Sequence, residues 1–488
     1  MICSTSSSGR AAGHRALLLL ALLLPSCALW SQQAAAPLEC GSLTSDSDGR
    51  PATRPTSIRW SASCSGGSGD LVYEWKSLGD SAEIIEQVGP SPTWDWSPIR
   101  AGTFRVMVTV EDSTGARVGS DWSEPIVILP AAGAADLIAV LPAENLTGWI
   151  APVDTVDELL RARFVDRGFR LVDDATLASF MERHRIRDTG GVTSRMARAS
   201  KDELGAGAVL VTSLELFRDA APPRVALFAR LVSSGDQPEI AWMDSVGMSG
   251  DGHLGLLALG RIGAAGILLE KSIDCLTASL ARSLPELVAE RAPLDLRGEP
   301  VECDSQGEVV ALPPGEVGKR RYRPQTAFRA PLIDSSRRYS VAIVPFANAT
   351  DRKYAGTLIG LHFINQMVRN EHLTVVEPGL VREALLENRV IMRAGPSLEN
   401  AEALSSDETL GVDLVLSGTV FDYQDSLGTP KVEFSVNIIE RSTLKVVWAS
   451  HSYNTGVDGV LFFGLGTVHT AHQLASRMAR GTFEVMTR

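Results

Sequence analysis

The residues of this chain that could do chemistry, by type and spacing, are its cysteines and two neighbouring histidines. Six cysteines are present, and none has the Cys-x-x-Cys spacing of zinc sites and thioredoxin-like motifs. Four of them form two local pairs, Cys40 with Cys64 and Cys275 with Cys303, which is typical of a protein from an oxidising compartment. We therefore expect two disulfides.

His469 and His472 are spaced three residues apart on a predicted helix and could share a metal ion. No carboxylate joins them as in a His-Glu-x-x-His site, so the spacing favours two histidines on a helix surface. The chain also lacks a Gly-x-Ser-x-Gly nucleophile motif and a glycine-rich phosphate loop with its lysine. The sequence predicts a protein that is not an enzyme, with no catalytic residues, no metal and no cofactor.

The amino terminus has the pattern of a targeting segment. Arg10 and Arg15 precede an apolar run, Ala16–Leu24, that is too short to span a bilayer. The next residues, Leu24-Pro-Ser-Cys27, resemble a bacterial lipobox, whose cysteine is lipidated. We expect residues 1–27 to be a signal peptide and Cys27 to carry a lipid. Cleavage after Ala28 without lipidation is the alternative.

The composition excludes several kinds of partner. A length of 488 residues suits about three domains, and 44% hydrophobic and 21% charged residues are typical of globular proteins. The net charge of −12 disfavours nucleic acid and anionic lipid headgroups. No later run reaches the roughly 18 apolar residues of a membrane helix. We expect membrane attachment through the amino-terminal lipid alone.

Residues 57–130 alternate apolar and polar positions between turn signals, with Gly115 at a predicted hairpin turn. This pattern predicts a small antiparallel β-sandwich, preceded by a polar tether over residues 28–56 from which Cys40 packs onto it. The stretch 92–112 resembles bacterial Ig-like and PKD-like repeats. Trp94 and Trp96 share one face of a strand, where they contact a partner or sugar or else complete the core.

The remaining chain contains an internal repeat. Ile138-Ala-Val-Leu-Pro142 matches Val341-Ala-Ile-Val-Pro345 at an offset of 203 residues, and Asn145-Leu-Thr147 matches Asn348-Ala-Thr350 at the same offset. Trp242 and Trp448 match at an offset of 206. We read the Asn-x-Thr sequences as turn residues. Each copy is predicted as strand, helix, strand, helix, three strands and helix, over residues 131–290 and 338–488, with a linker at 291–337.

The second copy resembles the curli-secretion lipoprotein family (CsgG-like, and TolB amino-terminal-like), and the first copy does so more weakly. The resemblance rests on the stretches Val341–Phe346, Gly379–Arg389, Leu414–Tyr423 and Val432–Thr443. It implies a bacterial envelope protein with a mixed sheet between helices. Pore-forming members insert long membrane hairpins, whereas only eight residues separate Tyr423 from Val432 here.

Together these features predict a small all-β Ig-like sandwich followed by two tandem three-layer α/β domains of CsgG-like type. We expect an exported envelope lipoprotein in the periplasm, anchored to the outer membrane. It would be a non-enzymatic adaptor or assembly component that binds other envelope proteins or itself. Its candidate partner contacts are Trp94, Trp96, Leu461, Phe462 and Phe463. The alternative is a periplasmic module that binds glycan or peptidoglycan through the sandwich.

Overall fold

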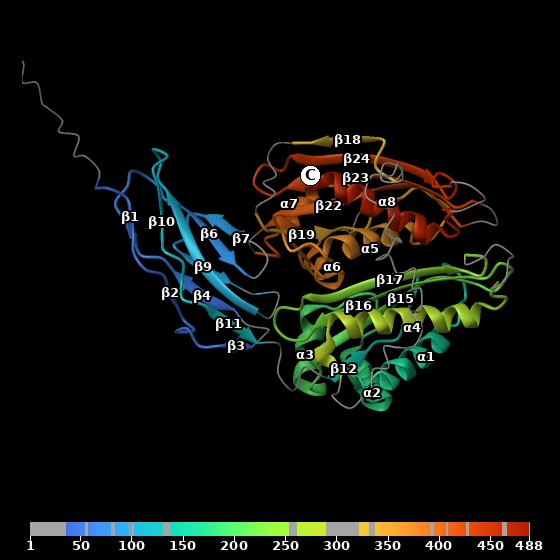
Figure 1. Ribbon diagram of the computed structural model, residues 1–488. Coiled ribbons are helices and arrows are strands. Elements are labelled where there is room, and N and C mark those ends of the chain that lie inside the picture. Colours follow the sequence, from blue (N-terminus) through green and yellow to red (C-terminus); the bar gives the residue numbers. More distant parts are fainter. Residues whose placement is uncertain are drawn as a thin grey trace, which may run out of the picture.

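The computed structural model describes residues 36–53, 57–79, 83–96, 98, 102–129, 137–252, 261–288, 322–330, 337–390, 395–406, 408–425, 429–460 and 466–487. These residues form a multidomain mixed α/β protein with several sheets and eight α-helices (Figure 1). No helix in these ranges is long and apolar enough to cross a membrane. The predicted signal peptide, with Cys27, lies outside the described residues.

The amino-terminal unit contains only strands within its described ranges. One sheet has the order β3-β11-β9-β6-β7, with β10 on β9, and two small sheets pair β2-β4-β8 and β1-β5. Their alternating apolar residues meet in one core built around Trp75 and Val108. The strands are β1 (Glu39–Cys40), β2 (Thr44–Ser45), β3 (Ala52–Thr53), β4 (Ile58–Ser61), β5 (Cys64–Ser65), β6 (Val72–Leu78), β7 (Glu83–Gly89), β8 (Thr93–Trp96), β9 (Gly102–Glu111), β10 (Arg117–Gly119) and β11 (Ile126–Leu129).

Part of the predicted tether belongs to this unit, which corrects the sequence-based interpretation. Residues 39–53 add the short strands β1, β2 and β3, which pair with β5, β4 and β11. Backbone pairing of this kind needs no apolar periodicity, so the polar composition concealed it. The predicted disulfide between Cys40 and Cys64 is confirmed, and it joins the paired strands β1 and β5. The predicted hairpin is confirmed too, because Val118 pairs with Val110 and Gly115 adopts a φ of 84°.

The first α/β unit has the strand order β14-β12-β15-β16-β17, with β13 on β15. β12 is parallel to β14 and β15, while β15, β16 and β17 form an antiparallel meander. Helices α1 and α4 cover one face of this sheet, and α2 and α3 cover part of the other. The elements are β12 (Leu137–Val140), β13 (Glu144–Asn145), α1 (Val153–Asp166), β14 (Arg170–Leu171), α2 (Asp174–His184), α3 (Ser194–Leu204), β15 (Ala208–Arg218), β16 (Arg224–Ser233), β17 (Ile240–Ser249) and α4 (Ala265–Ser283), followed by a 3-10 turn at Pro285–Leu287.

The second α/β unit repeats this arrangement, with the order β21-β19-β22-β23-β24 and β20 on β22. Helices α5 and α8 cover one face, and α6 and α7 cover part of the other. The elements are β19 (Tyr339–Ile343), β20 (Ala347–Asn348), α5 (Ala355–Met367), β21 (Leu373–Val375), α6 (Pro378–Glu387), α7 (Leu398–Ser405), β22 (Leu414–Gln424), β23 (Lys431–Glu440), β24 (Val446–Thr455) and α8 (Ala471–Met486). The pattern of each copy missed one helix, α3 or α7.

The repeat extends to irregular details of the strands. Each meander has a β-bulge at the same place, between Leu214 and Leu216 in the first copy and between Val420 and Asp422 in the second. The Asn-x-Thr turns also match. The side-chain oxygens of Asn145 and Asn348 each accept the backbone N–H of the threonine two residues on, at 3.0 Å in both copies. The interpretation of these sequences as turn residues is confirmed.

The end of the predicted linker is also a strand. β18 (Thr326–Arg329) pairs antiparallel with β24 and forms the edge of the second sheet. This segment has too few residues to show a period, so its composition alone indicated a linker. On the other side of the second unit, Arg338, just before β19, forms an ion pair of 2.8 Å with Glu86 of β7 in the amino-terminal unit.

The two α/β units stack in four layers, as Figure 1 shows from top to bottom. The second sheet lies at the top, with α5 and α8 beneath it. The first sheet comes next, and α4 and α1 lie beneath it, with α2 at the bottom of the view. Helices α5 and α8 therefore lie between two sheets, and the two ends of the stack differ: one is a sheet face and the other a helix face.

Candidate functional site

The face of the first sheet that α2 and α3 leave free is covered by the second unit. Phe228 of β16 and Met243 of β17 belong to the same apolar core as α5 and α8. Both side chains are almost completely buried. Because one core runs across both units, the two repeats form a single body.

A buried ion pair lies beside this shared core. The guanidinium of Arg230 donates to both carboxylate oxygens of Glu377 at 2.9 Å, and the side chains are 1% and 0% exposed. Burial would lower the pKa of Arg230, but the Glu377 carboxylate raises it. Glu377 also caps the start of α6 and accepts the backbone N–H of Val192 at 3.0 Å. One carboxylate thus joins a strand, a loop and a helix from both units.

Further polar contacts surround the interface. Arg224 pairs with Asp425 at 3.3 Å, and Arg369 pairs with Asp244 at 2.8 Å. Arg352, in the second Asn-x-Thr turn, donates to the backbone oxygens of Thr147 and Glu215. The two equivalent turns therefore lie against each other.

The bulge of the first meander places Glu215 at the centre of this interface. Its carboxylate accepts the hydroxyl of Tyr423 at 2.5 Å and pairs with Nδ1 of His472 at 2.5 Å. Burial alone would raise the pKa of Glu215, but the charge and hydrogen bond of His472, with His362 and Tyr423, lower it to about 2. Burial, together with the Glu215 charge, raises the pKa of Tyr423 well above its usual value.

His362 of α5 completes this cluster. Its ring lies 4.7 Å from the ring of His472 and 4.8 Å from that of Phe228, measured between centroids. Burial, with the charge of His472, lowers the pKa of His362 to about 3, so its imidazole is neutral. Neither ring nitrogen has a hydrogen-bond partner among the described residues.

The interpretation of His469 and His472 as two helix-surface histidines is wrong for His472. Its side chain is 1% exposed, because α8 presents it to the neighbouring sheet of the first unit. His469 instead faces Asp251, with 3.4 Å between Nδ1 and the carboxylate. The structure separates the two and joins His472 to residues 110 or more positions away, His362 and Glu215.

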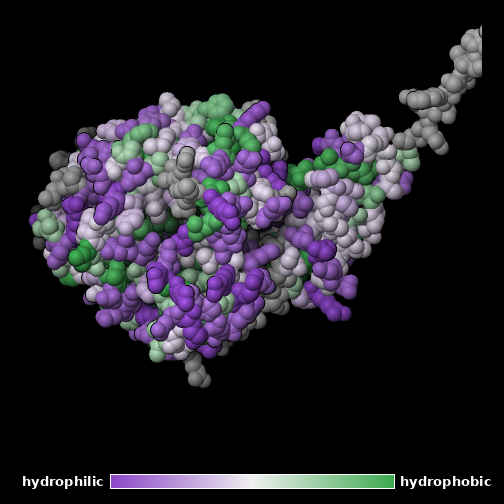
Figure 2. Space-filling view, turned by 180° about the vertical axis from the view of Figure 1, so that it is seen from behind, coloured by the Kyte–Doolittle hydropathy of each residue, from purple (hydrophilic) through white to green (hydrophobic). Residues whose placement is uncertain are grey.

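The matching face of the second sheet has no such cover among the described residues. Phe421, the bulge residue equivalent to Glu215, is 45% exposed, and Tyr453 on the same face is 41% exposed. Phe328 of β18 pairs with Ala449 on this face and is 56% exposed. We call this surface the open face. In Figure 2, hydrophobic patches interrupt the polar surface over the second unit, which lies at the top of both views.

Polar groups divide the aromatic residues of the open face. His451 pairs with Glu433 at 3.2 Å, and its ring lies 5.8 Å from that of Phe421. Asn437 occupies the position equivalent to Arg230, since each pairs with the matching residue of the preceding strand. The open face is therefore amphipathic, with aromatic side chains beside uncharged and charged polar ones.

The helix face at the other end of the stack is mostly polar, although Val165 and Ile267 are exposed on it. Asp154, Glu158 and Asp166 are exposed on α1, and Glu270 is exposed on α4. In contrast, every described residue of α5 except Thr357 is buried, since sheets lie on both sides of that helix. The outer surface of α1 and α4 is thus suited to water, as is usual for the end repeat of a stack.

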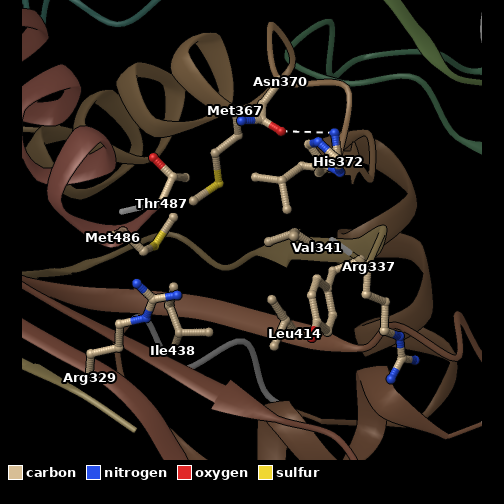
Figure 3. Close-up of a pocket in the computed structure, with 12 residues that line it drawn as sticks. Arg329, Arg337, Val341, Met367, Asn370, His372, Leu414, Ile438, Met486 and Thr487 are labelled. Atoms are coloured by element: carbon tan, nitrogen blue, oxygen red, sulfur yellow. Dashed lines mark hydrogen bonds between the residues drawn. The ribbon is translucent and has the colours of Figure 1, made fainter. Parts of the chain in front are cut away.

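A small apolar cavity lies within the second unit, between the carboxyl ends of α5 and α8 and strands β18 and β19 (Figure 3). Its volume is about 230 Å³. The guanidinium of Arg337 lies 5.0 Å from the Tyr339 ring and pairs with Asp413. The cavity can hold a small apolar group. Its described lining residues are Arg329, Arg337, Tyr339, Val341, Met367, Asn370, His372, Leu373, Leu414, Ile438, Met486 and Thr487.

The structure places the predicted site residues differently from the sequence-based expectation. Trp94 and Trp96 are buried in the sandwich core, with ring centroids 5.9 Å apart, so neither is available to a partner or a sugar. Of the two interpretations of this pair, completion of the core agrees with the structure and contact with a partner does not, because their period of two places both rings on the inner face. The glycan-binding alternative loses the residues on which it rested.

The other predicted site residues are placed only in part. Leu461, Phe462 and Phe463 lie outside the described residues. Cys275 is buried on α4 and takes part in a disulfide. Cys303, its predicted partner, is outside the described residues, so this pairing stays a prediction.

Sequence reasoning missed Glu215, Arg230, His362 and Glu377. For Glu215, Arg230 and His362 a signal exists in the differences between the copies, whereas Glu377 aligns with another acidic residue, Asp173. The repeat aligns Glu215 with Phe421, Arg230 with Asn437 and His362 with Leu159. Where the units meet, an ionisable residue thus occupies a position that is apolar or uncharged in the other copy. Agreement between the copies indicated the fold, while these departures mark the interface.

No family model matches the chain, and no curated protein matches it. Among solved structures, the chain is similar to the PelC dodecamer from Paraburkholderia phytofirmans, with 20% identity, 32% of this chain and 94% of that chain covered, and a TM-score of 0.21. It is similar to lipoprotein GNA1162 from Neisseria meningitidis (19% identity, 24% and 82% covered, TM-score 0.20) and to the LpoB C-terminal domain from Escherichia coli (12%, 24% and 82%, 0.20). At these scores the likeness assigns neither a family nor a function.

Proposed function

We propose that this chain is an exported, non-enzymatic adaptor of the bacterial cell envelope, and that it binds another envelope protein on the open face of its second α/β unit. One observation carries the binding proposal. The two sheets are equivalent, and the first buries this face under a pair of helices, whereas the second exposes it. The helices that cover the first sheet therefore indicate what kind of structure could cover the equivalent face of the second sheet.

The partner that fits is a pair of amphipathic helices. On the first sheet, α5 and α8 supply both apolar side chains and hydrogen-bonding groups. The open face offers Phe328, Phe421 and Tyr453 as apolar anchors, with Glu433 and His451 for polar contacts. Exposed aromatic residues beside polar ones are typical of protein interfaces.

A second copy of the chain fits this face poorly. The helices that it would present are α1 and α4, whose outer surface carries Asp154, Glu158, Asp166 and Glu270. Burying these carboxylates against Phe421 and Phe328 would remove their hydration, and the neighbouring Arg163 is already paired with Asp166 and Glu270. We therefore favour a different protein over self-association.

Site-specific cross-linking in the native host tests the binding proposal. A photoreactive residue at Tyr453 should form one discrete adduct with another protein, whereas the same residue at Glu158 should form none. The substitution Phe421→Asp should abolish the Tyr453 adduct and leave the melting temperature unchanged. An adduct of twice the chain mass would instead establish self-association, and the absence of any adduct at Tyr453 would contradict the proposal.

Export and anchoring are tested separately. We propose that Cys27 is lipidated at the outer membrane, as the Leu24-Pro-Ser-Cys27 sequence suggests. The substitution Cys27→Ser should move the protein from the membrane fraction to the soluble periplasm. Retention in the membrane would point to the partner as the anchor, and a native protein already soluble would show that the leader is cleaved without lipidation.

A further inference from the structure

Three metal-binding side chains converge where the two α/β units meet. Glu215 comes from the bulge in β15, His362 from α5 and His472 from the first turn of α8. Their ligand atoms all lie within 4.8 Å of one another, and all three residues are buried. We propose that Glu215, His362 and His472 bind a divalent transition-metal ion of the zinc type, which links the two units.

The donor set suits this class of ion. Two imidazoles and one carboxylate form a common ligand set for Zn²⁺, with bond lengths of about 2.0–2.2 Å. Hard ions such as Mg²⁺ and Ca²⁺ prefer oxygen ligands throughout, so two histidines argue against them. Since the three atoms start within 4.8 Å, side-chain adjustments within the interface can bring them to one ion.

The lack of hydrogen bonds to His362 supports a metal ion independently of the distances between the three ligand atoms. Its side chain is fully buried, yet neither ring nitrogen has a hydrogen-bond partner among the described residues. An unsatisfied buried polar group of this kind destabilises a fold, and such groups in native proteins need an explanation. A bond from one ring nitrogen of His362 to a metal ion provides this explanation.

The surrounding residues orient the other two ligands. The Tyr423 hydroxyl holds one carboxylate oxygen of Glu215, and Ser245 lies 3.2 Å from Nε2 of His472. These contacts leave the second Glu215 oxygen and Nδ1 of His472 facing each other at 2.5 Å. An ion bound between these two atoms takes the place of their hydrogen bond, while the Tyr423 hydroxyl continues to orient the carboxylate.

Among the described residues, this ligand set is found at the junction of the units. The equivalent positions in the other copy hold Phe421, Leu159 and Gly266, none of which binds metal through its side chain. Because Glu215 belongs to the first unit and both histidines to the second, an ion here joins the units directly. The buried location means that the ion enters when the interface forms, not afterwards.

Refolding the full chain with and without zinc tests this proposal. Protein refolded from denaturant with zinc chloride, then passed through a desalting column, should retain one zinc per chain by mass spectrometry of the metal content. Its melting temperature should exceed that of protein refolded with a chelator by several degrees. If no zinc is retained, the proposal is wrong and the cluster is a metal-free polar contact.

Two variants separate metal binding from folding. His362→Leu introduces the residue of the first copy; it should abolish zinc retention while the metal-free melting temperature stays equal or rises. His451→Leu, on the open face, is the matched control and should keep one zinc. If His362→Leu does not fold, Glu215→Gln gives the same reading. Stoichiometric zinc in a folded variant of either ligand would overturn the assignment.

Discussion

The two sheets of the α/β pair have the same strand order and the same bulge, but different neighbours. The first sheet packs against α5 and α8 of the second unit, so Phe228 and Arg230 are buried. In the second sheet, Phe421 and Tyr453 of the matching face are exposed. The difference shows that strand order decides the shape of such a face, while a few side chains decide what covers it.

The bulge illustrates this division. In both copies it turns one extra residue toward the same face, at position 215 and at position 421. A carboxylate at the first position receives Tyr423 and His472 from the neighbouring unit. A phenyl ring at the second position lies beside His451 and remains half exposed. The same backbone feature thus serves an internal contact in one copy and a surface in the other.

The largest expected effect on stability comes from the buried charge that the first sheet has and the second sheet lacks. Glu377→Ala leaves Arg230 buried without its counter-charge and removes the cap of α6, so the free energy of unfolding should fall by about 4–6 kcal/mol. Asn437→Ala, at the position equivalent to Arg230, should change it by about 0.5 kcal/mol or less. Urea unfolding of both variants checks this. Similar losses in the two variants would show that the faces do not differ in energy.

The next prediction concerns a position at which the two copies should contribute equally to stability. Trp242 and Trp448 are both buried and both lie next to the second bulge of their meander, so each Trp→Ala change should destabilise the protein by about 3–5 kcal/mol. Thermal unfolding of the two variants should give losses of the same size. A difference greater than about 2 kcal/mol would mean that the two cores are packed differently.

A smaller effect is expected at the Asn-x-Thr turns. Asn145→Ala and Asn348→Ala each remove two accepted hydrogen bonds and one donated bond, with an expected loss of about 1–2 kcal/mol in unfolding free energy. The loss should be larger at Asn145, because Thr147 is buried. Asn348→Asp keeps the accepting oxygen and should recover most of the stability. Equal stability of the alanine and asparagine proteins would exclude a structural role for the turns.

The smallest effect on stability is expected at the open face. Phe421→Ser exposes no core atoms, so the free energy of unfolding should stay within about 0.5 kcal/mol of the original value. The Tyr453 cross-link to a partner should nevertheless disappear. Destabilisation by more than about 2 kcal/mol would show instead that Phe421 contributes to the core of its own unit.

Much of the architecture of each unit could be predicted from the sequence, because it follows from local patterns. Alternating residues indicated the sandwich strands, and matched apolar runs indicated the repeat. The three tether strands and β18 escaped prediction, since short edge strands such as Thr326–Arg329 pair through backbone groups that any residue supplies. Two elements, α3 and α7, were missed because small and polar residues make up much of their buried faces.

The interface between the units could not be predicted from such patterns. It depends on which faces meet in space, and contacts such as that between Arg230 and Glu377 join residues 147 positions apart. His472 was read as a surface residue because its own helix showed no partner. The available signal was the presence of charged residues at strand positions that are apolar or neutral in the other copy. This signal can be recognised only after the two copies have been aligned.

The position of α8 at the end of the repeat affects the order in which the protein matures. A chain that emerges amino end first exposes Phe228 and Met243 long before residues 471–486 exist to cover them. During this interval the first unit exposes an apolar surface, and Arg230 lacks its partner Glu377. Both conditions promote aggregation of incomplete chains. The incomplete chain would therefore aggregate more readily than the full chain until the second unit is made, and premature termination before Ala471 would leave that surface permanently uncovered.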